Sequence, residues 1–191
     1  MSSPVLASFR PSPSAGWVWL LGLTAVIAAS GVPLVLPGVV AAEERIVVWA
    51  TLAIIVPLVG YLLLALVSLP TMRYDLTTDE LVLSCGPLYR YRVPYAQITG
   101  VHRTTLTPTL WSSTRMPGLA IGGVPYAGVG IVKMCATRMS RDILVVAAGK
   151  RRYGLTPDDE TGFMATLTSL VPHLESPASK DTFGGADVSW S

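Results

Sequence analysis

The sequence has little charge, and two long stretches have none. Asp, Glu, Lys and Arg make up 14% of the 191 residues, against about 25% in a typical soluble domain. No charged residue occurs between Pro11 and Ala42 or between Ile46 and Met72. This distribution excludes a protein that is water-soluble throughout. It predicts membrane segments in the first part of the chain and a water-soluble domain after Met72.

Cysteine and histidine are also rare. The two cysteines, Cys85 and Cys135, match no zinc or redox spacing, and we expect them to be small, buried apolar side chains rather than a disulfide framework. His102 and His173 are far apart and lack companion ligands at metal-binding spacing. The sequence therefore predicts no metal site, no cofactor and no recognisable catalytic triad.

Two apolar runs, Gly16 to Leu36 and Ile46 to Leu69, are long enough to cross a bilayer, which takes about 20 residues. Trp17 and Trp19 at the outer end of the first run fit an interfacial aromatic belt. We therefore predict a tail over residues 1–15 and a transmembrane helical hairpin over residues 16–72.

Flanking charge predicts the orientation of this hairpin. The loop between the spans is Glu43-Glu44-Arg45, while the outer flanks contain more arginine, at Arg10, Arg73, Arg90 and Arg92. Because positive charge accumulates on the cytoplasmic side, we predict a multi-pass protein of the cell membrane with both termini in the cytoplasm.

A cleaved signal peptide is the competing interpretation, because Val40-Ala41-Ala42 resembles a cleavage site. The uncharged run before it is far longer than a signal-peptide core of about 7 to 15 residues. Even after cleavage, the second span would leave the later domain inside.

From Arg73 onward the pattern changes to short β-rich segments between turn residues, as in a sandwich or small barrel. Alternation on both sides of Gly86-Pro87 predicts a hairpin. Residues 106–128 are rich in Gly and Pro, and they predict a long loop with at most one short strand. About seven strands are expected, over residues 73–76, 80–85, 88–93, 98–105, 129–137, 142–147 and 151–155.

A helix is predicted to close the domain. Thr156 is a suitable cap, Pro157 suits the first helical position, and the acidic residues 158–160 favour a helix N-terminus. An apolar stripe follows at helical spacing, at Phe163, Met164, Leu167, Leu170 and Val171. Pro172 ends the helix, the domain spans residues 73–175, and the polar residues 176–191 are expected to be disordered.

Several short motifs resemble the bacterial pleckstrin-homology (PH) domain family that lies behind one or two transmembrane helices. They are Leu-Thr-x-Asp-x-Leu from Leu76, Val-Pro-Tyr-x-x-Ile from Val93, the Gly-rich centre, and Leu-Thr-Pro-Asp from Leu155 leading to Phe163. The resemblance implies a membrane-anchored α+β protein, with a PH-like sandwich or barrel and a C-terminal helix. It supplies no catalytic residues.

Basic side chains are the candidate ligand contacts. Lys150, Arg151 and Arg152 form the densest cluster, and it predicts contact with anionic headgroups if it faces the membrane. Arg90 and Arg92 share a strand face and are candidates for the same patch. The alternative is a solvated strand end without a ligand. Arg115 is a further candidate, at the mouth of the glycine-rich loop.

The glycines of that loop do not predict a nucleotide site, because no Gly-Lys-Ser/Thr follows them. Nucleic acid is also not expected, because the domain is only weakly basic.

The sequence thus predicts a non-enzymatic, membrane-anchored interaction module. Its expected partners are the lipid bilayer and an unknown membrane protein. The alternatives are an anionic-lipid sensor that uses the basic hairpin and, less favoured, an accessory subunit of a membrane enzyme or transporter. Salt-sensitive binding to liposomes distinguishes the lipid sensor from the protein-binding module.

Overall fold

The computed structural model of the chain describes residues 4–36, 45–107, 115–116 and 118–174. The tail predicted to be disordered, residues 176–191, lies outside these ranges. The elements are β1 (Val5–Phe9), α1 (Gly16–Val35), α2 (Arg45–Thr71), β2 (Arg73–Thr77), β3 (Glu80–Cys85), β4 (Tyr89–Pro94), a 3-10 turn (Tyr95–Gln97), β5 (Ile98–Thr104), β6 (Arg115–Met116), β7 (Leu119–Tyr126), β8 (Gly130–Ala136), β9 (Ile143–Ala148), β10 (Arg151–Leu155) and α3 (Glu160–Leu170).

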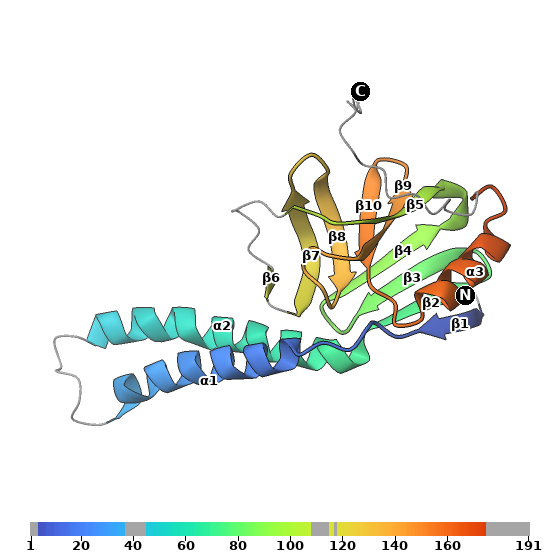
Figure 1. Ribbon diagram of the computed structural model, residues 1–191. Helices are drawn as coiled ribbons and strands as arrows, with labels where there is room; N and C mark the ends of the chain where they lie inside the picture. Colours follow the sequence, from blue (N-terminus) through green and yellow to red (C-terminus); the bar gives the residue numbers. More distant parts are fainter. Residues whose placement is uncertain (1–3, 37–44, 108–114, 117, 175–191) are drawn as a thin grey trace.

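Helices α1 and α2 lie side by side and project from a β domain (Figure 1). Both are long and apolar enough to cross a membrane, and their bounds agree closely with the predicted spans. Much of their apolar surface is exposed, including Trp19 at 62% and Trp49 at 71%. The predicted helical pair is confirmed.

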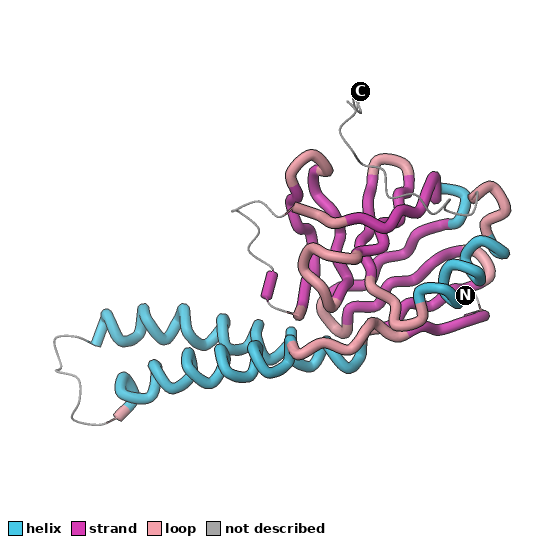
Figure 2. Tube along the Cα trace, viewed as in Figure 1, coloured by secondary structure: helices cyan, strands magenta, loops and turns pink. Residues whose placement is uncertain are grey.

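The β domain consists of two sheets (Figure 2). The first has the order β1-β2-β3-β4 and is antiparallel throughout. The second has the order β5-β9-β10-β8-β7-β6, and within it β10 runs parallel to β8. Among the described residues, nine strands follow the helices and α3 follows the last strand, so the predicted α+β, PH-like fold is confirmed.

Part of the predicted N-terminal tail belongs to the domain. Val5–Phe9 is strand β1 and pairs with β2, with Phe9 opposite Tyr74. Farther along, the backbone N–H of Ser12 donates to the carbonyl oxygen of Thr156 at 2.8 Å. The prediction missed this strand because its partner lies beyond the entire hairpin in sequence. The two flanks of the hairpin are therefore neighbouring strands of one sheet.

The predicted 106–128 loop also contains regular structure. Leu119–Tyr126 forms the eight-residue strand β7, which pairs with β8 along its length. Gly122 has a φ of 83°, a conformation that glycine adopts without steric cost. Glycine and proline lower strand propensity, and for this reason the sequence alone favoured a loop.

Helix α3 packs its apolar stripe on the first sheet, as predicted. Phe163 and Leu167 are fully buried, and the Phe163 ring meets the edge of Phe9 at 5.4 Å and Tyr74 at 6.4 Å between centroids. The helix cap is Asp159, whose Oδ1 accepts from the N–H of Gly162 at 2.8 Å, and not Thr156. Thr156 is instead buried, where its hydroxyl accepts from the N–H of Thr137.

The two cysteines form a disulfide, which corrects the expectation of two unpaired thiols. Cys85 ends β3 and Cys135 lies in β8, with their Cα atoms 5.8 Å apart and both residues fully buried. The bond joins the two sheets across the core. Their separation of 50 residues in sequence gives no indication that the strands face each other, so the pairing was not predictable from spacing.

Candidate functional site

The outer face of the first sheet presents two arginines on either side of a serine. In the β2-β3-β4 register, Arg73 lies opposite Ser84, and Ser84 lies opposite Arg90. Side chains alternate between the faces of a strand, and the neighbouring Tyr74 and Leu83 are fully buried against the core. The Arg73, Ser84 and Arg90 side chains therefore share the face that points away from the core.

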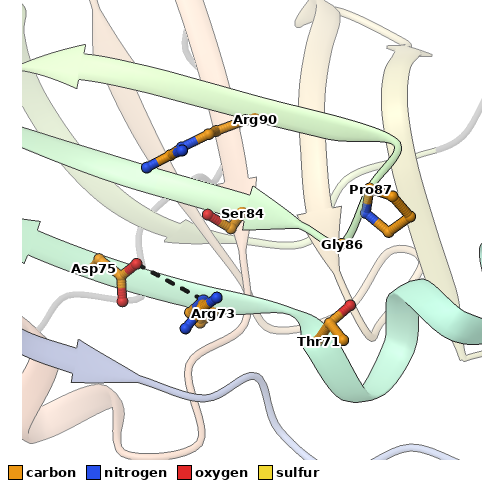
Figure 3. A pocket seen from close by; sticks show the side chains of 7 residues that line it. All are labelled: Thr71, Arg73, Asp75, Ser84, Gly86, Pro87 and Arg90. Carbon is orange, nitrogen blue, oxygen red and sulfur yellow. Dashed lines mark ion pairs between the residues drawn. The ribbon is translucent and has the colours of Figure 1, made fainter. Parts of the chain in front are cut away.

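A cavity of about 290 Å³ lies over this row (Figure 3). Its walls come from the end of α2, from β2 and from the β3–β4 hairpin. The lining residues are Thr71, Arg73, Asp75, Ser84, Gly86, Pro87 and Arg90.

The charges around this cavity are only partly paired. Arg73 Nε lies 4.0 Å from Asp75 Oδ2, and its side chain is 64% exposed. The other carboxylate oxygen of Asp75 accepts from the hydroxyl of Ser8 at 2.6 Å. Arg90 is exposed and has no acidic partner among the described residues. The cavity is therefore suited to an anion rather than a cation.

Arg92 shares this face, as predicted, but it is engaged elsewhere. Its Nη1 lies 3.2 Å from Glu80 Oε1, in the row beyond Arg90. The structure thus assigns Arg90 and Arg73 to the cavity and Arg92 to an ion pair.

The walls of the cavity pack directly against the C-terminal end of α2. Only Met72 separates α2 from β2. Gly86, at the β3–β4 turn, has a φ of 60°, and a Cβ there would come within 2.6 Å of the Ser68 Cα. A side chain at this turn would force the hairpin away from α2.

The predicted basic cluster lies elsewhere. Lys150 and Arg151 belong to the turn and first residue of the β9–β10 hairpin, in the second sheet, and are exposed. In Figure 1 this hairpin turn lies on the side of the domain away from the helices. Arg152 Nη1 donates to the carbonyl oxygen of Val129. The structure does not bring these residues together with Arg90 and Arg92.

Arg115 lies in the short strand β6, which pairs with β7. Gly118, just before β7, lies at the start of α1, where the hydroxyl of Ser14 donates to its carbonyl oxygen at 2.7 Å. Gly16 and Gly118 approach so closely that a Cβ on either would collide with the other's backbone. The glycine-rich segment thus forms a second contact between the domain and the helix pair.

A second cavity, of about 280 Å³, lies near the start of α3. Arg103 contacts Asp142 at 3.1 Å and Glu160 at 3.8 Å, and Arg138 contacts Asp142 at 3.8 Å. Four of its five charged side chains are already paired, so it offers less to an incoming ligand than the first cavity.

Sequence reasoning missed a cation–aromatic group that links the two sheets. The Lys133 ammonium lies 5.3 Å from the Tyr91 ring and 5.7 Å from the Tyr153 ring. Burial, together with neighbouring Tyr89 and Tyr153, raises the pKa of Tyr91 to about 12. These residues come from three strands, and no local motif could have linked them.

Comparison with known proteins identifies the family. Residues 72–171 match the family described as bacterial PH domain, from the residue before β2 to the residue after α3. No curated protein and no solved structure matches the chain. The match covers more than half of the sequence, and the family is generally non-enzymatic. The chain belongs to the bacterial PH domain family.

Proposed function

We propose that this chain is a non-enzymatic interaction module, anchored in the membrane by α1 and α2, that binds an integral membrane protein through its PH domain. The observation that supports this most directly is the pairing of β1 with β2. Since these strands flank the helix pair in sequence, both ends of the anchor enter the same sheet.

The anchor follows from the surface of the helices. A soluble protein rarely exposes an apolar patch larger than a few hundred Å², whereas α1 and α2 expose apolar side chains along their length, among them Trp17, Val26, Ile54 and Val56. Lipid is the solvent that suits such a surface. Because both flanks enter one sheet, we place the segments before α1 and after α2 on the same side of the bilayer.

The double attachment fixes the orientation of the domain at the bilayer surface. A single flexible linker would let the domain tumble and reach soluble partners. This domain is instead attached through β1, through β2 and through the Gly16–Gly118 contact. The same face of the domain is therefore kept at a constant distance from the bilayer. Confinement of this kind raises the effective concentration toward partners in the same membrane.

The outer edge of β1 is the surface we assign to the protein partner. In the part of the chain that the structure describes, no strand pairs with that edge. Exposed edges in natural proteins are usually protected by charge or proline, as edge strand β4 is by Arg90, Arg92 and Pro94. Strand β1 has neither, and Val5 and Leu6 are 57% and 54% exposed. An extended segment of the partner is expected to pair there.

Site-specific photo-crosslinking in native membranes tests this function. A crosslinking residue at Val5 is expected to give one discrete adduct with another integral membrane protein, and one at exposed Ile131 is not. Leu6→Lys should greatly reduce the Val5 adduct, because the added charge protects the edge. Equal adducts at both positions, or adducts only with further copies of this chain, would contradict the proposal.

A further inference from the structure

We infer that the cavity at Arg73, Ser84 and Arg90 binds the phosphate of an anionic lipid headgroup in the leaflet next to the domain. The inference rests on the proposed function only in taking α1 and α2 as membrane spans. It names a ligand that is separate from the protein partner at β1.

The length of α2 places this cavity at the level of the headgroups. At 1.5 Å per residue, its 27 residues extend about 40 Å. A bilayer including its headgroup regions is about 40–45 Å thick. Arg45 begins the helix and Arg73 follows its end by two residues, so the two arginines lie in opposite headgroup layers.

The cross-strand row provides the geometry for a phosphate. Adjacent strands lie about 4.8 Å apart, so the Cα atoms of Arg73 and Arg90, with Ser84 between them, are about 10 Å apart. Two arginine side chains at this spacing can converge on one phosphate above the serine. Guanidinium groups bind phosphate oxygens with paired, charge-assisted hydrogen bonds, and the hydroxyl of Ser84 adds a donor in the same cavity. The hydroxyl of Thr71 already donates to carbonyl oxygens of α2.

The electrostatics of the cavity favour the same ligand. Arg90 has no acidic partner among the described residues, and the Arg73–Asp75 contact is long at 4.0 Å. The other carboxylate oxygen of Asp75 accepts a hydrogen bond from the hydroxyl of Ser8 in β1, so only part of the carboxylate faces Arg73. A bound phosphate would neutralise two exposed cations.

The helices already hold the domain at the membrane. The role of the bound lipid is therefore to fix the orientation of the domain relative to the bilayer. A headgroup bound between Arg73 and Arg90 fixes the first sheet against the bilayer and so holds the β1 edge at a constant height. The Lys150–Arg151 turn is separate from this cavity, because it lies on the side of the domain away from the helix pair (Figure 1).

The test uses the full chain, purified in mild detergent and titrated with phosphatidylglycerol or phosphatidylcholine while bound lipid is counted by native mass spectrometry. Wild type should retain one phosphatidylglycerol preferentially. Arg73→Gln with Arg90→Gln should weaken its binding about tenfold or more. The matched control, Lys150→Gln with Arg151→Gln, removes the same charge and should bind like wild type.

Two further arms complete the test. Ser84→Asp places a carboxylate between the arginines and should abolish the preference for phosphatidylglycerol while both arginines remain. Sodium phosphate should not displace the lipid, and displacement at equal concentration would show a site for free phosphate instead. Equal loss in the Lys150/Arg151 control, or no loss in Arg73/Arg90, would overturn the inference. Crosslinking at Val5 in these variants reports separately on the protein partner.

Discussion

Replacing Phe163 with alanine is expected to destabilise the PH domain by about 3–5 kcal/mol, the usual cost of removing a fully buried phenylalanine. The ring is buried completely and contacts Phe9 of β1 and Tyr74 of β2. The cavity left by its removal would therefore open where α3, the N-terminal strand and the first strand after the anchor meet. Calorimetric unfolding of the full chain in nanodiscs measures the effect.

The control for this substitution is Met164→Ala on the same helix. Met164 is only partly buried against the core, so its loss should cost much less than the loss of Phe163. Equal destabilisation by the two substitutions would contradict the packing of α3 through Phe163.

Loss of the Cys85–Cys135 disulfide is the second large expected effect. A bond that closes a loop of this length, with a separation of 50 residues, stabilises a domain by about 4 kcal/mol in the chain-entropy description. Reductant should therefore lower the free energy of unfolding of wild type by about that amount. It should leave Cys85→Ala with Cys135→Ala unchanged, and identical responses of the two proteins would contradict the bond.

The same bond bears on the side of the membrane that the domain occupies. Flanking arginines predict the cytoplasm, whereas structural disulfides are typical of oxidising compartments. Alkylation of intact cells before denaturation distinguishes the two. We expect no free thiol at Cys85 or Cys135, because the two are bonded to each other, and that result would indicate that the domain lies on the oxidising side. Two alkylated cysteines would retain the cytoplasmic prediction. The lipid site and the β1 edge require only that both termini share a side.

The features predictable from sequence were those written in local patterns. The uncharged runs predicted α1 and α2 to within two residues, because length and hydropathy suffice for an apolar helix. Alternation around Gly86 predicted the β3–β4 hairpin, and the stripe from Phe163 predicted the buried face of α3. The family motifs then predicted the arrangement of the domain that follows the helices.

The features that were missed depend on contacts between distant segments. Strand β1 is recognisable only from its pairing with β2 on the other side of the anchor. The disulfide requires that β3 and β8 face each other. The cavity needs Arg73, Ser84 and Arg90 in one cross-strand row, whereas sequence density directed attention to Lys150–Arg152. The local density of basic residues in a sequence does not predict which of their side chains lie close together in the folded domain.

The most direct test of the account is amide hydrogen exchange of the full chain in nanodiscs, followed over Val5–Phe9. The β1 amides bonded to β2 are expected to exchange as slowly as those of β3, because both strands belong to one cooperative sheet. Exchange at the rate of an unstructured peptide would show that the N-terminal segment is a free tail. The domain would then be attached to the membrane through α2 alone. The fixed orientation of the domain, on which both proposals depend, would be lost.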